Sequence, residues 1–214
     1  MTKLAKLYSW ISNRLYRHKL RNDNFTIIAN SCIAGVMYNK LGKKFLSPTI
    51  NLWIHDVEFF RFVRDLDYYL KQPLRFVSNN YGYPTAYCGD VMIHFNHYKD
   101  EDEAANKWYE RLKRINRDNV FIICSDRPME NEYVSHEDML SLKDVQCKGK
   151  VIFSVRQYDD IDYIVPLPMA SDGEWVNVYM FDKSKYLHRW RWETAWDWVH
   201  WLNTGEVRIR KCKM

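Results

Sequence analysis

The sequence lacks three features that would each place it in a well-defined class. Although 47% of its residues are hydrophobic, no apolar run approaches the ~20 residues of a membrane-spanning helix. The amino-terminal residues are basic, but no uninterrupted apolar segment follows them, so we expect no signal peptide. The five cysteines are odd in number and form no C-x-x-C pair, which argues against a disulfide framework and a structural zinc site. We therefore expect a protein of the reducing cytoplasm.

Repeats and low-complexity linkers are also absent from the 214 residues, which contain seven glycines and six prolines. A chain of this size fits one domain with at most an appendage. We expect a basic amphipathic helix over residues 1–22 and a single α/β domain over residues 23–214. Six of the nine tryptophans lie in the carboxyl-terminal part, and tryptophans in such number can form core, a partner surface or a platform for sugar stacking.

Acidic residues are missing from residues 1–21, where six lysines and arginines account for the net charge of +5. The same segment has four apolar residues at helical spacing, Leu4, Leu7, Ile11 and Leu15. This combination fits a helix that lies on an anionic membrane surface. The plainer alternative is a terminal helix whose apolar stripe packs on the domain. No basic stripe elsewhere extends the charge, so we expect no nucleic-acid partner.

The stretch from Asp90 to Ile123 has the clearest periodicity in the chain. Apolar and polar residues alternate over residues 91–96, which is typical of a strand. The period then changes to that of a helix, with its apolar stripe formed by Ala104, Trp108, Leu112 and Ile115. A β-rich run follows at residues 119–124. Strand, helix and strand in this order predict a βαβ unit in which Trp108 is buried against the sheet.

The rest of the chain alternates in a similar way. Further strands are expected at residues 25–29, 74–77 and 150–155, with an edge strand at 176–180 and a loop at 81–89. Helices are expected at residues 33–41, 56–70 and 192–202, with a shorter one capped by Ser135. The pattern predicts an α/β fold with an open, mostly parallel sheet of about five or more strands and helices on both faces.

Polar side chains follow the expected strands. They are Asn30, Ser31, Cys32, Asn79, Asn80, His97, Tyr98, Asp126, Arg127 and Arg156. In an open sheet of parallel strands the carboxyl ends share one edge, and ligands bind there. Loops are polar in any protein, which explains part of this pattern. It does not explain why a thiol, histidine, a carboxylate and two arginines occur together, so we expect a binding or catalytic site at this edge.

Three of these side chains are candidates for catalysis. Cys32 follows a strand and precedes a helix, where a thiolate nucleophile is favoured, although lone cysteines are more often small core residues. His97 at a strand end suits a general base or a substrate contact. Asp126 suits a carboxylate that orients a histidine or binds sugar hydroxyls; a turn or cap is its plainer role. His94 points to the opposite strand face from His97, so we assign no metal and expect His94 to make a supporting or substrate hydrogen bond.

The central stretch also resembles a known bacterial family. The resemblance rests on IHFNHY (residues 93–98), EAANKWYERLKRIN (103–116), DNVFII (118–123), Asn30 to Cys32 with Gly35, and Ser47 to Asn51. These segments are similar to a family of exopolysaccharide biosynthesis proteins, otherwise a domain of unknown function, over roughly residues 25–123. The resemblance implies a role in capsule or exopolysaccharide assembly and an α/β fold. It supplies no catalytic residues or cofactor, and Asn51 joins the substrate-binding candidates.

Three functions remain open. The first is a transferase that acts on an activated sugar or glycan precursor, with a carbohydrate or nucleotide-sugar ligand. The second is a non-catalytic accessory protein at the inner face of the cell membrane, docked through residues 1–21 and the tryptophan-rich end. The third is an esterase of the lipase-acylhydrolase (GDSL) type with Ser31 as nucleophile, which also needs a D-x-x-H near the carboxyl terminus, a motif that we do not assign in this sequence. Asp160 and Asp162 form a D-x-D triplet, a weak signal for a glycosyltransferase metal site.

Overall fold

The strands of the chain form two sheets of four strands each. The computed structural model describes residues 3–126, 134–156, 158–167, 176, 180 and 189–210. One sheet is parallel throughout, in the order β1 (Thr26–Ala29), β6 (Val120–Ser125), β7 (Gly149–Ser154) and β8 (Ile164–Pro166). The other is antiparallel, in the order β2 (Trp53–Ile54), β5 (Val91–His94), β4 (Thr85–Cys88) and β3 (Leu74–Val77). The chain therefore has the predicted α/β class.

The central stretch is not the parallel βαβ unit that its pattern predicted. It does contain a strand, β5, a helix, α5 (Glu101–Leu112), and a strand, β6, but the two strands belong to different sheets. β5 pairs instead with β4 through a two-residue turn in which Gly89 has a φ of +64°. The segment expected to be a loop therefore supplies β4, and the single sheet of five or more strands is replaced by two smaller ones.

The parallel sheet begins at an edge strand, β1, whose free backbone groups are covered by side chains. The Tyr38 hydroxyl accepts a hydrogen bond from Ile27 N at 3.1 Å, and Thr49 Oγ1 accepts one from Ala29 N at 3.0 Å. Covering an edge in this way prevents pairing with another strand. Tyr38 belongs to α2 (Ile33–Leu41), which ends as expected at Gly42 in the left-handed conformation.

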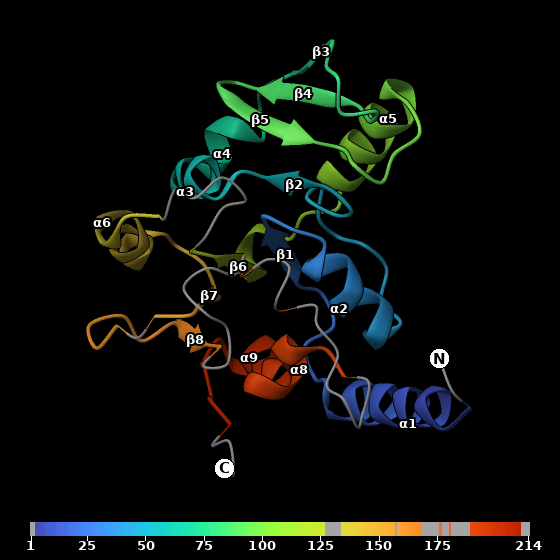
Figure 1. Cartoon of the computed structure of the whole chain (residues 1–214), viewed down its shortest axis with the longest axis vertical. Coiled ribbons are helices and arrows are strands. Elements are labelled where there is room, and N and C mark those ends of the chain that lie inside the picture. Colours follow the sequence, from blue (N-terminus) through green and yellow to red (C-terminus); the bar gives the residue numbers. More distant parts are fainter. Residues whose placement is uncertain are drawn as a thin grey trace.

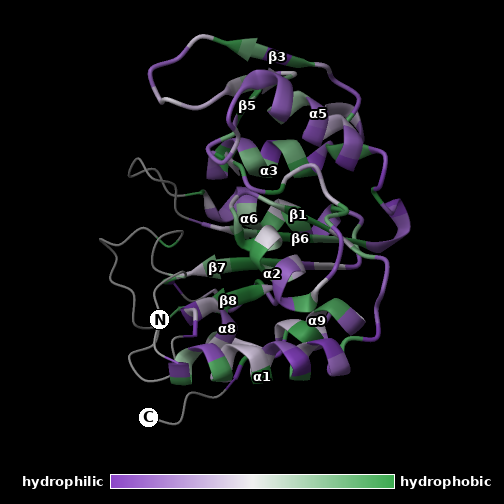
Figure 2. Ribbon diagram, turned by 90° about the vertical axis from the view of Figure 1, so that its right-hand side faces the viewer, coloured by the Kyte–Doolittle hydropathy of each residue, from purple (hydrophilic) through white to green (hydrophobic). Residues whose placement is uncertain are grey.

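The helices pack around the two sheets in layers. The remaining ones are α1 (Lys3–Lys19), α3 (Asp56–Arg64), α4 (Leu66–Tyr69), α6 (His136–Ser141), α8 (Arg191–Ala195) and α9 (Trp198–Thr204), with short 3₁₀ turns at Arg117–Asn119 and Leu142–Asp144. The antiparallel sheet and α5 lie at one end of the molecule, the parallel sheet lies in the middle, and α1, α8 and α9 lie at the other end (Figure 1). Seen from the side, α1 runs along the outside of that end (Figure 2).

The core has one apolar cluster on each face of the parallel sheet. Alternation along β1 sends Ile28 towards the antiparallel sheet, α3 and α5, and Ile27 towards α2 and α9. The second cluster contains four fully buried tryptophans, Trp192, Trp196, Trp198 and Trp201. These four rings are therefore core and do not form the exposed docking surface that the accessory hypothesis requires. The helix expected there is two helices, and most of the edge strand expected at 176–180 lies outside the described residues.

Trp108 is buried as predicted, at 1% exposure, with its ring edge-on to Phe95 at a centroid distance of 6.1 Å. Because a cavity would remain, we expect Trp108→Ala to lower the free energy of unfolding by roughly 3–5 kcal/mol. The matched control is Trp10→Ala, because Trp10 is 56% exposed and its loss should change stability by less than about 0.5 kcal/mol. Chemical denaturation of both variants measures the difference, and equal midpoints would contradict the burial of Trp108.

Candidate functional site

The carboxyl edge of the parallel sheet collects the polar residues that follow its strands. Asn30, Ser31 and Cys32 follow β1, Asp126 follows β6, and Arg156 follows β7 by two residues. Since β1, β6 and β7 are neighbours and run parallel, the ends of these strands lie side by side. The structure therefore brings together five of the residues that the sequence proposed for one site.

A buried carboxylate, Asp56, connects this edge to the antiparallel sheet. Asp56 is the first residue of α3 and is 1% exposed. Its Oδ1 accepts a hydrogen bond from the side-chain amide of Asn30, and its Oδ2 accepts one from Ser125 Oγ at 3.1 Å. The carbonyl oxygen of Asn30 in turn accepts a hydrogen bond from Ile54 N in β2, at 3.1 Å. Burying a carboxylate is costly unless such donors compensate it.

A second buried carboxylate, Asp126, lies at the same edge with no exposed surface. Its Oδ2 accepts a hydrogen bond from Ser154 Oγ, which also accepts one from Arg156 N at 2.8 Å. The thiol of Cys124 lies close to both acids. Burial raises its pKa, and the negative charges of Asp56 and Asp126 raise it further. The edge thus contains two enclosed carboxylates with serine and asparagine donors around them.

Sequence reasoning did not select three members of this network as site residues. Asp56 was predicted only as the start of a helix, because the strand before it, β2, has two residues and shows no periodicity. Ser125 and Ser154 are the last residues of β6 and β7, and both are fully buried. A serine that ends a mostly apolar strand and lies one or two residues before a charged residue is the signal that could have found them.

The amino end of α2 forms the side of the edge next to β1. Ser31 is 7% exposed, and its hydroxyl has no hydrogen-bond partner among the described residues. Cys32 is the N-cap residue, half-buried, and burial raises the pKa of its thiol to about 11. A thiol with this pKa is neutral near pH 7, so the environment works against the predicted nucleophilic role. The N–H groups of the first turn of α2 have no acceptor within the helix.

Asn51 lies directly on this first turn. A Cβ atom added to Gly35 would be 2.7 Å from Asn51 Oδ1, so a larger residue here would displace the Asn51 side chain. Asn51 itself has a φ of +59°, a conformation that asparagine tolerates better than most residues. Two of the segments that carry the family resemblance, residues 30–35 and 47–51, are therefore in contact.

Three other candidates belong to the antiparallel sheet. His97 is exposed in the turn after β5, so the predicted arrangement of His97 and Asp126 at one edge of one sheet is wrong. The side chain of Asn79 holds the turn before β4, where its Nδ2 donates to Thr85 Oγ1 at 2.9 Å. Asn80 is exposed in the same turn. Polar residues after antiparallel strands do not converge in the way that those after parallel strands do.

Tyr98 is buried in a network of hydrogen bonds. Its hydroxyl donates to the carbonyl oxygen of Ile50 and accepts a hydrogen bond from Arg111 Nη1. Arg111 Nη1 also donates to Ile50 O at 3.2 Å. Arg111 belongs to α5 and is itself 7% exposed. These bonds fix the loop that carries Asn51.

His94 is enclosed by aromatic rings. It stacks on Trp53 with ring centroids 3.6 Å apart, and Tyr81 and Tyr83 meet it edge-on at 5.2 and 6.1 Å. Its Nδ1 is buried without a partner among the described residues, so the expected hydrogen bond through this atom is not present there. Burial, together with the positive charge of nearby His55 when protonated, lowers the pKa of His94 to about 4.

The D-x-D triplet does not form a metal site with its neighbours. Asp160 and Asp162 are both exposed, and Asp160 pairs with His136 at 2.9 Å, a hydrogen bond that lowers the pKa of the carboxyl. Across the part of the chain that the structure describes, no three His, Cys, Asp or Glu side chains converge as metal ligands. Arg127, another substrate-binding candidate, lies outside the described residues.

The esterase hypothesis needs a histidine beside Ser31. The sequence does contain a D-x-x-H, Asp197 to His200, but it lies on α9. His200 Nε2 is 3.3 Å from Glu206 and 3.2 Å from Thr204. The residue between these two, Gly205, packs against Gly149 at the amino end of β7. The histidine is therefore associated with the opposite edge of the sheet from Ser31, which removes the general base from this hypothesis.

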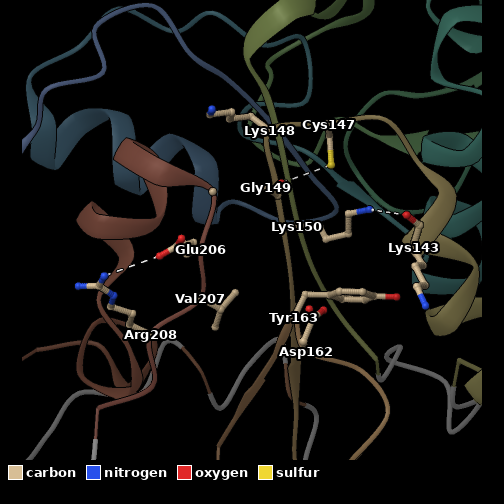
Figure 3. Close-up of a pocket in the computed structure, with 11 residues that line it drawn as sticks. Lys143, Cys147, Lys148, Gly149, Lys150, Asp162, Tyr163, Glu206, Val207 and Arg208 are labelled. Atoms are coloured by element: carbon tan, nitrogen blue, oxygen red, sulfur yellow. Dashed lines mark hydrogen bonds and ion pairs between the residues drawn. The ribbon is translucent and has the colours of Figure 1, made fainter.

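A hollow of about 670 Å³ lies at that amino edge (Figure 3). It is lined by Lys143, Cys147, Lys148, Gly149, Lys150, Asp162, Tyr163, Gly205, Glu206, Val207 and Arg208. The ammonium group of Lys150 donates to three backbone carbonyl oxygens, and Arg208 is 3.7 Å from Glu206. Two basic residues of this hollow, Lys150 and Arg208, thus already have partners. The hollow contains none of the residues proposed for the site at the carboxyl edge.

Comparison with known proteins gives two matches. The sequence model of a family described as a domain of unknown function, DUF1919, matches residues 4–203. A protein of Haemophilus influenzae, described as an uncharacterized protein, is 36% identical over 146 residues, which is 68% of this chain and 69% of that protein. The first match confirms the resemblance to a domain of unknown function. In the described residues, no helix is long and apolar enough to cross a bilayer.

The environment of His94 predicts a pH dependence of stability. The pKa of His94 in the folded chain is about 4, below the ordinary 6.5. The contribution of the neutral side chain to the free energy of unfolding is therefore complete above pH 6.5 and is lost as the pH falls towards 4. We expect His94→Gln to reduce the difference in unfolding free energy between pH 7 and pH 5 by about 1–2 kcal/mol. Urea melts at the two pH values measure it. The control His97→Gln, at an exposed site, should keep the wild-type difference, and an unchanged difference in His94→Gln would refute the prediction.

Proposed function

The chain belongs to the DUF1919 family, and we propose that it is a transferase of exopolysaccharide or capsular polysaccharide assembly that acts on an activated sugar or glycan precursor. The pathway is suggested by the family resemblance of the central segments. The reaction class is suggested by the carboxyl edge of the parallel sheet. The observation that carries the proposal is the pair of buried carboxylates, Asp56 and Asp126, at this edge of the sheet.

Burying the two carboxylates at this position costs free energy. An ionised carboxylate without compensation loses several kcal/mol on burial, and here the compensating donors are Asn30, Ser125 and Ser154. Networks of this kind are concentrated at functional sites. Because both carboxylates are fully buried, we assign them a positioning role: Asp56 holds Asn30, Asp126 holds Ser154, and neither touches the sugar itself.

The other polar groups at this edge suit a phosphorylated ligand. Ser31 and the first-turn N–H groups of α2 offer hydrogen-bond donors at the positive end of a helix, which favours phosphate. Arg156 is exposed at the same edge and supplies a guanidinium group. Asn51 and the neutral thiol of Cys32 are next to them and can face sugar hydroxyls. Activated sugars carry such a phosphate or diphosphate.

In the proposed transfer, an acceptor hydroxyl forms a bond to the anomeric carbon while the bond from that carbon to the phosphate oxygen breaks, and the proton of the hydroxyl is released to water. Negative charge then develops on the departing phosphate. Donors that are already oriented towards this charge lower the barrier, because they need no reorganisation. Arg156, Ser31 and the amino end of α2 would have this role.

A thermal-shift screen of nucleotide sugars, with and without divalent cations, tests the proposal. We expect at least one nucleotide sugar to raise the melting temperature of the wild type, since a ligand at ~100 times its Kd adds about 2.7 kcal/mol. Arg156→Gln and Ser31→Ala should remove most of this rise while leaving the ligand-free melting temperature close to that of the wild type.

The matched control is Arg208→Gln, which removes an exposed arginine from the hollow at the amino edge. It should keep the full ligand-induced rise. The site assignment fails if Arg208→Gln loses the rise and Arg156→Gln keeps it, because the ligand would then bind at the opposite edge. If no nucleotide sugar binds at all, the transferase proposal is wrong in this form.

A further inference from the structure

The helix α1 turns an apolar face away from the protein. Five large side chains on it are exposed: Leu4 (77%), Leu7 (53%), Trp10 (56%), Ile11 (43%) and Leu15 (53%). The two buried residues of the helix, Ala5 and Tyr16, lie on its other side. The alternative in which the leucine stripe packs on the domain is therefore wrong, and the helix contacts the domain through its less apolar side.

The inner side of α1 is firmly attached. The ring of Tyr16 packs edge-on against Trp198 at a centroid distance of 4.6 Å. Arg17 Nε donates to the carbonyl oxygen of Lys40 at 3.0 Å, and Asn203 Nδ2 donates to that of Lys19 at 3.0 Å. The helix is thus folded and oriented before anything binds to its outer face, so binding there does not need to order it. Figure 2 shows this helix as the outermost layer at its end of the molecule.

The exposed face is also basic. A second row of residues at helical spacing runs beside the leucine stripe and consists of Lys3, Lys6, Trp10 and Arg14, all exposed. The guanidinium group of Arg14 lies over the ring of Trp10, 5.0 Å from its centroid. No acid occurs in residues 1–22, and the next one, Asp23, is paired with Lys43. The positive charge of the outer face is therefore not neutralised along the helix.

We propose that the outer face of α1 docks the protein on an anionic lipid bilayer. In this arrangement the leucine stripe enters the boundary between headgroups and acyl chains, and the basic row meets the lipid phosphates. Trp10, with an apolar ring beside cationic groups, suits the interface between the two. The helix lies on the membrane and does not span it, in agreement with its length and charge.

Charge argues for a bilayer over a second copy of the chain. Pairing two copies through this face would bring two basic rows together with no acid on either helix to compensate them, and like charges across an interface cost several kcal/mol. An anionic bilayer compensates every base at once and also accepts the apolar stripe. The proposal is independent of the transferase activity, because it uses none of the residues at the sheet edge.

Flotation of the whole protein with lipid vesicles tests the proposal. We expect binding to vesicles of phosphatidylcholine mixed with phosphatidylglycerol, little binding to phosphatidylcholine alone, and weaker binding as salt is added. Leu7→Gln/Ile11→Gln should reduce the partition coefficient about tenfold or more, through loss of buried apolar surface. Lys3→Gln/Lys6→Gln/Arg14→Gln should reduce it to a similar degree and remove most of the preference for anionic lipid.

Matched controls come from exposed residues elsewhere. Tyr68→Gln replaces another exposed apolar side chain, and Lys71→Gln/Lys113→Gln removes two exposed charges. Both should bind like the wild type, and circular dichroism and melting temperature should show that all variants are folded. Equal binding to neutral vesicles, or wild-type binding by the α1 variants, would overturn the proposal. So would concentration-dependent dimerisation that Leu7→Gln/Ile11→Gln abolishes, without vesicle binding, because α1 would then be a self-association surface.

Discussion

The contact between Asn30 and Asp56 joins the two halves of the fold. The side-chain amide of Asn30 donates to the carboxylate, and its main-chain carbonyl accepts from Ile54 in β2. β2 then pairs with β5, and β5 with β4, so the antiparallel sheet is aligned from the end of β1. Removing Asn30 would leave a buried carboxylate with one donor fewer, which is among the most damaging changes in a protein interior.

Local features of the fold could be predicted from the sequence, because their causes are local. Gly42 ends α2 at the expected residue, β3 has the expected bounds, and Ser135 caps α6 through a hydrogen bond from Asp138 N. The partners of each strand could not be predicted in this way. The alternation of β5 fits a parallel or an antiparallel neighbour equally well, and the tight turn at Gly89 decides between them.

The difference between local features and strand partners also explains which residues of the candidate site could be predicted. Asn30, Asp126 and Arg156 were placed together correctly because they follow strands that are parallel neighbours. His97 follows a strand of the other sheet, and nothing in its local sequence reveals this. Asp56 was overlooked because only the three-dimensional structure shows its burial and its two hydrogen bonds. The raised pKa of Cys32 likewise depends on packing, which the sequence does not display.

The amphipathic pattern of α1 indicates a helix with two different sides, but it does not indicate which side faces the protein. Apolar stripes usually face the core, because burial stabilises them. Here Tyr16 fills the contact with Trp198, and the leucines remain outside beside the basic row. A glycan precursor carried on a lipid diphosphate would use both proposed surfaces: its phosphates fit the donors at the amino end of α2, and its lipid is held in the bilayer that α1 would bind. The two proposals can fail separately, since the vesicle experiment needs no sugar and the thermal-shift experiment needs no lipid.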